Sequence, residues 1–273
     1  MPPRSPKRTS RLQSSTAHKS DRRSESDGID IPLNWLKSGI GVLLLPCCVV
    51  ATQSFLSAFG ETSARTMLIQ SAELWFFFIG VLLWLIYFFG LPRPLYLYVL
   101  GHELTHAFFV LLCGGKITEF KVKSAGGHIV TNKNNVIISL SPYFIPFYSV
   151  IVLALFGIIG FFVEDLFNYH PGVLFWGQIG FSWSWLLYMS IGVTWCFHLT
   201  FTTWMITKNQ PDLKQNGTFF SLVFIYFINL IILSGTLIIV SNEISFTGFI
   251  QSILSNGNEL IDRISKMIGN TNS

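Results

Sequence analysis

The segment LGHELTH holds two histidines and a glutamate at a spacing that suits metal chemistry: His102, Glu103 and His106. Histidines four residues apart on a helix project from the same face, so both imidazoles can bind one zinc ion. The neighbouring glutamate can then act as general base on a water whose pKa the zinc lowers from roughly 15.7 to about 7. The pattern therefore predicts a catalytic zinc site with Glu103 as the catalytic residue.

The segment that carries this motif, residues 95–113, is otherwise apolar and long enough to cross a bilayer. Ionisable side chains are costly inside a membrane-spanning helix, and those that occur there usually have a function. The setting therefore favours metal binding over a polar helix surface.

A catalytic zinc ion usually has three protein ligands and an open position for water, so a third ligand must come from elsewhere in the chain. Glu119 and His128 lie in a polar segment, where a solvated side chain is the simpler interpretation. His198 lies in an apolar segment, and Asp212 follows Pro211 in a polar break between two apolar runs. The residues alone leave these alternatives open, together with His170 in a loop.

The composition indicates a multi-pass integral membrane protein. Hydrophobic residues make up 51% of the 273 residues and charged residues only 12%, about half the charged fraction of a soluble globule. A spanning helix needs about 20 predominantly apolar residues. We expect about six spans, within residues 38–60, 74–90, 95–113, 136–163, 166–207 and 217–240.

The expected fold class is an all-α polytopic membrane protein with a small β-hairpin after the histidine helix. Residues 114–135 alternate polar and apolar side chains, and Gly126-Gly127 is a turn signal. Pro142 and Pro146 should interrupt the span that follows. Gly192 should allow close helix packing later in the chain.

We expect three regions in the chain. Residues 1–30 form a basic, disordered tail on the cytoplasmic side, with no nucleic acid as partner. Residues 31–242 form a transmembrane metalloprotease domain. Residues 243–273 form an amphipathic tail on the membrane surface, which could break at Gly257.

The motif and the segments around it resemble the site-2 protease family of intramembrane zinc metalloproteases. In that family an HExxH helix is followed by a β-hairpin, a span with a small residue before proline, and a later motif that contains aspartate. Here Ser141-Pro142 is similar to the second element and Gln210-Pro211-Asp212-Leu213 to the third, with Leu213 where the family has glycine. The resemblance covers residues 95–230 and implies Asp212 as the last zinc ligand.

The predicted function is zinc-dependent hydrolysis of peptide bonds in membrane-embedded or membrane-adjacent protein substrates, within the lipid bilayer. Auxiliary roles are expected for His198, Pro142 and Asn229. The main alternative is a membrane regulator or scaffold that keeps the motif without turnover. A di-iron oxidase would need about eight clustered histidines, and this chain has 6 that are scattered.

Overall fold

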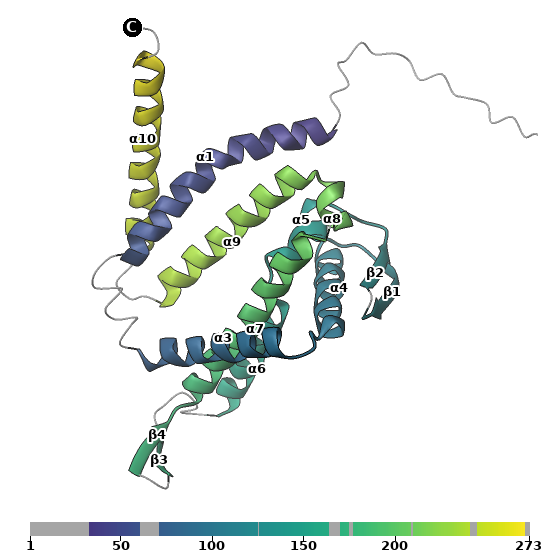
Figure 1. The fold of residues 1–273 in the computed structure, drawn as a ribbon, viewed down its shortest axis with the longest axis vertical. Coiled ribbons are helices and arrows are strands. Elements are labelled where there is room, and N and C mark those ends of the chain that lie inside the picture. Colours follow the sequence, from purple (N-terminus) through teal and green to yellow (C-terminus); the bar gives the residue numbers. More distant parts are fainter. Residues whose placement is uncertain are drawn as a thin grey trace, which may run out of the picture. The chain divides into compact units, whose positions relative to one another are not determined.

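The structure, a computed structural model, describes residues 33–60, 71–124, 126–163, 170–174, 177–208, 210–240 and 245–270. The predicted disordered tail, residues 1–30, lies outside this range. The described part is mostly helical (Figure 1). Its helices are α1 (Leu33–Gly60), α3 (Ala72–Gly90), α4 (Leu95–Leu112), α5 (Val136–Leu140), α6 (Phe147–Phe162), α7 (Trp183–Ile206), α8 (Pro211–Gln215), α9 (Thr218–Val240) and α10 (Phe246–Asn270).

Among the described residues, four helices are long and apolar enough to cross a membrane: α1, α3, α4 and α9. A fifth candidate is the pair formed by Val136–Tyr143 and Phe147–Phe162, which is bent by 79°. This bend confirms the predicted interruption of the span, since Pro142 lies in the short 3-10 turn Ser141–Tyr143 and Pro146 directly precedes α6. The chain is thus a multi-pass integral membrane protein.

These four or five candidates among the described residues compare with the six spans expected. The described part of residues 166–207 contains one long helix, α7, in which Ser, Thr and His interrupt the apolar sequence and which is not among the candidate spans. Before α7 come two short antiparallel strands, β3 (His170–Leu174) and β4 (Gly177–Phe181). Pro171 and several glycines disfavour a helix in this part of the chain, whatever its hydrophobicity.

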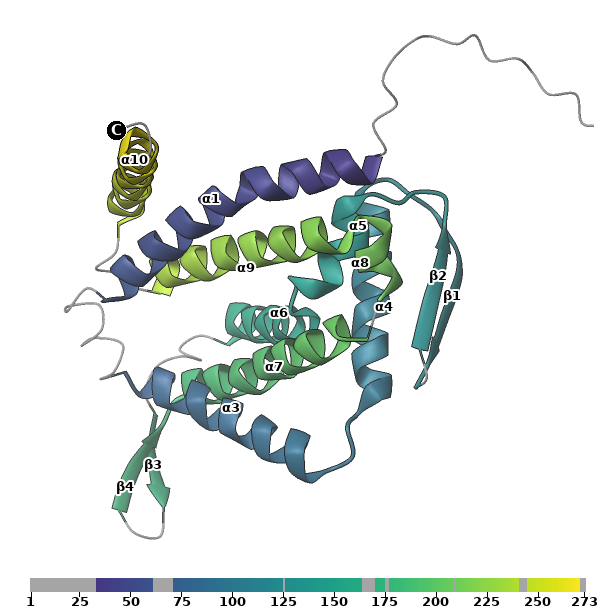
Figure 2. The same cartoon turned by 45° about the horizontal axis from the view of Figure 1, so that its top comes forward.

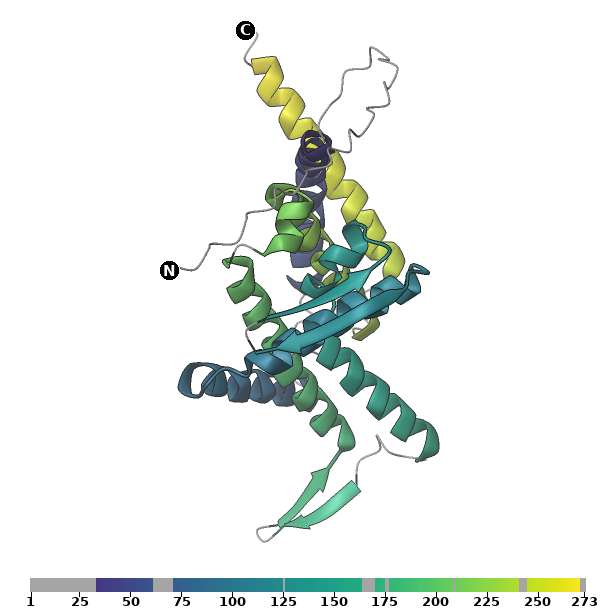
Figure 3. The same cartoon turned by 90° about the vertical axis from the view of Figure 1, so that its right-hand side faces the viewer.

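The predicted hairpin after the histidine helix is confirmed. Strand β1 (Ile117–Lys123) pairs antiparallel with β2 (Gly126–Thr131). Both strands contact α4 and lie beside it (Figures 2 and 3). The turn comes earlier than predicted, because Gly126 and Gly127 already pair with Lys123 and Val122.

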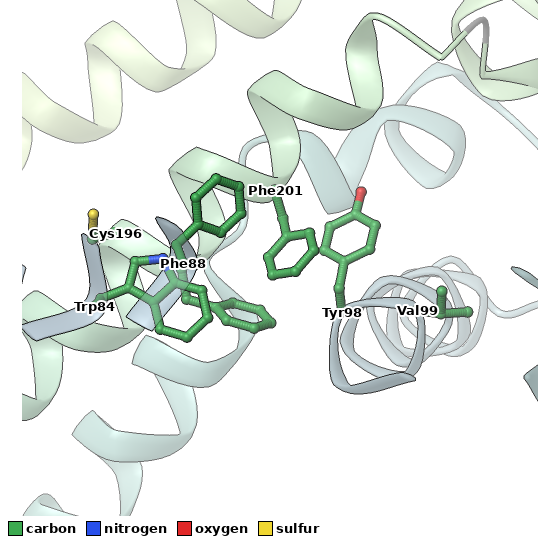
Figure 4. Packing of buried hydrophobic residues seen from close by; sticks show 7 residues of the cluster. Trp84, Phe88, Tyr98, Val99, Cys196 and Phe201 are labelled. Atoms are coloured by element: carbon green, nitrogen blue, oxygen red, sulfur yellow. The ribbon is translucent and has the colours of Figure 1, made fainter. Parts of the chain in front are cut away.

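Helices α3 and α7 pack at very close range through glycines. A side chain at Gly80 would meet the backbone carbonyl of Met189, and one at Gly192 would meet that of Phe77. Small residues allow this kind of backbone approach between membrane helices, which confirms the packing role predicted for Gly192. An aromatic cluster then joins α3 and α7 to α4 (Figure 4): Trp84, Phe88, Tyr98, Val99, Cys196, Phe197 and Phe201.

Helix α1 lies along α9, and the Thr52 and Tyr226 hydroxyls share a hydrogen bond of 2.7 Å between them. Helix α10 packs on α1 and is continuous over its 25 residues. The break considered at Gly257 is therefore absent, because one glycine costs only about 1 kcal/mol in a helix interior.

Candidate metal site

The two histidines of the motif lie one turn apart on α4, as predicted. The helix begins directly after Pro94 and ends at Leu112, and Gly114 just beyond it adopts a left-handed φ of 70°. His106 is buried, and so is Glu103 at 7% exposure. The rings of His102 and His106 meet edge to face with centroids 4.8 Å apart.

Asp212 reaches the same place from the short helix α8. Pro211 begins this helix, where a proline costs no hydrogen bond and its fixed φ suits the first turn. Leu213, which follows Asp212, is buried in a cluster with Leu140 and Tyr143. Leu213 thus anchors α8 to the interrupted span, and Asp212 faces the histidines as a result.

The three donor atoms lie within reach of one metal ion. Nε2 of His102 is 3.2 Å from Nε2 of His106 and 3.3 Å from Oδ2 of Asp212. Nε2 of His106 is 3.6 Å from the same oxygen. A tetrahedral zinc ion with bonds of about 2.0–2.1 Å places its ligand atoms about 3.3–3.4 Å apart. The observed triangle fits that spacing, so the group could hold such an ion.

Each donor group has a further hydrogen-bond partner. Nδ1 of His106 donates to the Ile138 carbonyl at 2.7 Å, which leaves Nε2 of a neutral ring with its lone pair for a metal. Nδ1 of His102 lies 3.3 Å from the hydroxyl of Tyr98. The hydroxyl of Tyr143 donates to Oδ2 of Asp212 at 3.3 Å.

The Tyr98 partner comes directly from the aromatic cluster. Its ring stacks on Phe201 with centroids 4.9 Å apart. In Figure 4 its hydroxyl points away from the other rings of the cluster. Packing of α4 on α7 therefore sets the position of a group that contacts His102.

The side chain of Glu103 extends from α4 toward the hairpin. Its carboxylate interacts electrostatically with His106 and Asp212. A side chain at Gly127 would come within 2.6 Å of Cγ and 3.0 Å of Oε1 of Glu103. The hairpin thus approaches Glu103 closely because β2 has a glycine at this position.

The site is less enclosed on the side of Asp212. The side chain of Asp212 is 22% exposed, compared with 9% for each imidazole. Burial raises the pKa of the Asp212 carboxyl, but the contacts with His102 and His106 outweigh burial and hold that pKa below its usual range. Asp212 is therefore a carboxylate, the form that binds a metal.

The other candidates for the third ligand are not part of the group that the described residues form. Glu119 and His128 lie together on the exposed hairpin, with 3.7 Å between Oε1 of Glu119 and Nε2 of His128. His198 interacts with the backbone of Tyr143 and with the ring of His102, so it lies next to the site. His170 lies in β3, whose side chains are outside the described set.

The expected auxiliary residues lie around Tyr143. Pro142 is buried in the same short turn as Tyr143. Asn229 donates a hydrogen bond of 3.3 Å to the Tyr143 carbonyl. Sequence reasoning missed Tyr98, Tyr143 and Asn216. The spacing of four residues from Tyr98 to His102, and from Asp212 to Asn216, was the available signal.

Asn216 holds the end of α8 to two other helices. Its amide nitrogen donates to Oγ of Ser139 at 2.5 Å and to the Asp212 carbonyl at 3.4 Å. Its amide oxygen accepts a hydrogen bond of 2.7 Å from Nζ of Lys37. These bonds fix the backbone that carries Asp212.

Fold and site together define a multi-pass helical membrane protein with a His-His-Asp group that could hold a metal ion. Comparisons with protein-family models, with curated proteins and with solved structures gave no match. The functional conclusion therefore rests on the geometry of this chain.

Proposed function

We propose that this protein is a zinc-dependent intramembrane protease similar to the site-2 protease family. The observation that carries the proposal is the contact of Asp212 with both histidines of an HExxH motif inside a candidate membrane span. His102 and Asp212 are 110 positions apart in the sequence, so only the fold brings them together. Two neutral imidazoles and a carboxylate are a usual ligand set for catalytic zinc.

His102, His106 and Asp212 would hold the zinc ion, which would supply Lewis acidity toward a water molecule and the carbonyl of the scissile peptide. Glu103 takes a proton from that water while the water oxygen forms a bond to the carbonyl carbon. When the carbon–nitrogen bond breaks, Glu103 passes the proton to the leaving amine. The products are a carboxylic acid and an amine, and Glu103 returns to its starting state.

The hairpin supports an extended polypeptide as the substrate. A substrate that stays helical hides its carbonyls in its own hydrogen bonds, so it must unwind before cleavage. Among the described residues, β1 and β2 form a two-stranded sheet, which leaves one edge of each strand for pairing with an added strand. Gly127 brings this sheet against Glu103, which would hold an added strand near the general base.

The proposal is tested without knowledge of the substrate. Membranes from cells that express the wild type or Glu103→Gln are treated with a reagent that labels new protein N-termini, which are then identified by mass spectrometry. We expect N-termini within or beside the spans of other membrane proteins in the wild type alone. General acid–base groups contribute about 10²–10⁴-fold to rate, so the variant should lose these products.

Glu259→Gln is the matched control, because Glu259 is an exposed carboxylate of α10, outside the hairpin and the metal site. It should give the same N-termini as the wild type. Zinc in the purified proteins should be equal for all three, since Glu103 is not among the three ligands. Identical N-termini in the wild type and Glu103→Gln would reject the protease and favour a regulator without turnover.

A further inference from the structure

The C-terminal helix α10 leaves a wide apolar stripe uncovered by the described part of the chain. Positions separated by three, four and seven residues share one face of a helix. Five of the exposed large apolar side chains of α10 follow this spacing over about five turns of helix: Phe246, Ile250, Leu254, Ile261 and Ile264. The polar side chains Glu259, Asp262 and Lys266 lie on the other face.

The flank of this stripe holds α10 against the end of α1. Phe249 is buried with Ala58 in a small cluster. Asn256 donates a hydrogen bond of 2.8 Å to Oγ of Ser54. α1 ends at Gly60, so the contact residues lie about 3–9 Å from its end at 1.5 Å of rise per residue.

That position corresponds to the edge of a bilayer. The span within α1, Trp35–Gly60, has 26 residues, or about 39 Å of helix against a hydrocarbon core of about 30 Å. Its last turns therefore reach the headgroup region. Amphipathic helices at a membrane surface lie about 5–10 Å into the boundary between headgroups and acyl chains, the depth at which Ser54 and Ala58 contact α10.

The direction of α10 is consistent with a helix that lies at the membrane surface. In Figures 1 and 2 α10 runs across the direction of α1 and α9 rather than along it. If α1 and α9 cross the bilayer, a helix across them lies along its surface. The exposed stripe can then face the acyl chains while the opposite side faces water.

The charges of α10 indicate which lipids it suits. The polar side carries Glu259 and Asp262 together with Arg263 and Lys266, so the formal charges cancel. Arg263 is already paired with Glu259 at 2.6 Å. Attraction to anionic lipid needs an excess of Lys and Arg, which α10 lacks.

From the stripe, the anchor on α1 and the balanced charge, we propose that α10 lies in the surface of a zwitterionic bilayer beside the end of α1. The apolar stripe of α10 is buried among acyl chains at the boundary. This proposal does not depend on the proposed protease activity. Binding of α10 to the bilayer should not require anionic lipid.

The test uses the full-length protein in phosphatidylcholine vesicles, with dansylalanine introduced by codon suppression at one position at a time. Leu254 and Ile261 probe the stripe, and Asp262 and Lys266 are matched controls on the other side; all four are exposed, so the label disturbs no packing. A lipid with a nitroxide high on its acyl chain serves as quencher. We expect blue-shifted emission and several-fold stronger quenching at the two stripe positions.

Added phosphatidylserine or higher salt should leave that contrast unchanged. Equal weak quenching at all four positions would overturn the proposal, because the stripe would then face water. A blue shift without quenching at 254 and 261 would also overturn it, because protein, such as a second copy of the chain, would cover the stripe. Quenching that needs phosphatidylserine would overturn the zwitterionic preference.

Discussion

At the scale of single residues, the site combines a motif that is continuous in sequence with one ligand from far away. His102 and His106 are fixed by helix geometry alone, so the HExxH spacing was sufficient to predict their common face. The residues could not by themselves select Asp212 among five candidates for the third ligand. The structure brings Asp212 to both histidines, whereas Glu119 and His128 contact each other on the exposed hairpin.

Replacement of Asp212 by alanine should remove one of three zinc ligands. Loss of a group that merely supports a ligand costs about 10–100-fold in metal affinity, and we expect loss of the ligand itself to exceed that range. Zinc in the purified protein is measured by mass spectrometry after dialysis against a metal buffer. Asp262→Ala, in an exposed aspartate of α10, should keep wild-type zinc, and equal zinc in both variants would place the third ligand elsewhere.

Tyr143→Phe tests the hydrogen bond that Asp212 accepts. The variant keeps the buried ring and loses only the hydroxyl, 3.3 Å from Oδ2 of Asp212. Zinc affinity should fall by about 10–100-fold in a competition titration with a chelating dye. In Tyr148→Phe the lost hydroxyl bonds the Leu97 carbonyl instead, so affinity there should not change.

At the scale of elements, long apolar runs were the most reliable signal in the sequence. The candidate spans α1, α3, α4 and α9 lie where expected, since about 20 apolar residues in a row favour few other structures. Residues 166–207 were harder to interpret because lack of charge does not distinguish a helix from a glycine-rich β-pair. The close packing of α3 on α7 depends on which glycines face each other, which one sequence does not reveal.

Gly127→Ala tests whether the hairpin positions Glu103. A Cβ at this position would lie 2.6 Å from Cγ of Glu103 and 2.9 Å from the Lys121 carbonyl. Either β2 or the Glu103 side chain must then shift, so cleavage should fall severalfold while zinc content stays at the wild-type value. The readout is the yield of new N-termini in membranes together with zinc analysis.

Gly157→Ala controls for the added methyl group, since Gly157 in α6 has no neighbour within 4 Å of such a Cβ. It should cleave as the wild type does. Unchanged cleavage in Gly127→Ala would mean that the position of Glu103 does not depend on the hairpin.

At the scale of the whole molecule, two separate clusters of buried side chains determine the site. The cluster around Phe201 holds α4 against α3 and α7 and supplies Tyr98. The cluster around Leu140 and Leu213 holds α8 against the interrupted span and α9. Contacts between segments this far apart have no local sequence pattern, which is why Tyr143 was not predicted, whereas Tyr98 and Asn216 stand four residues from His102 and Asp212.

Because the metal ligands come from both parts, a bound ion should link them and stabilise the fold. A ligand that binds only the folded state adds about 2.7 kcal/mol at 100 times its Kd. We therefore expect zinc to raise the thermal midpoint of the detergent-solubilised wild type, followed by intrinsic fluorescence, and a chelator to reverse the rise. Glu103→Gln should respond as the wild type does, and Asp212→Ala should respond far less. An equal zinc response in Asp212→Ala would mean that the stabilising ion binds away from the three ligands, and the link between α4 and α8 would then be packing alone.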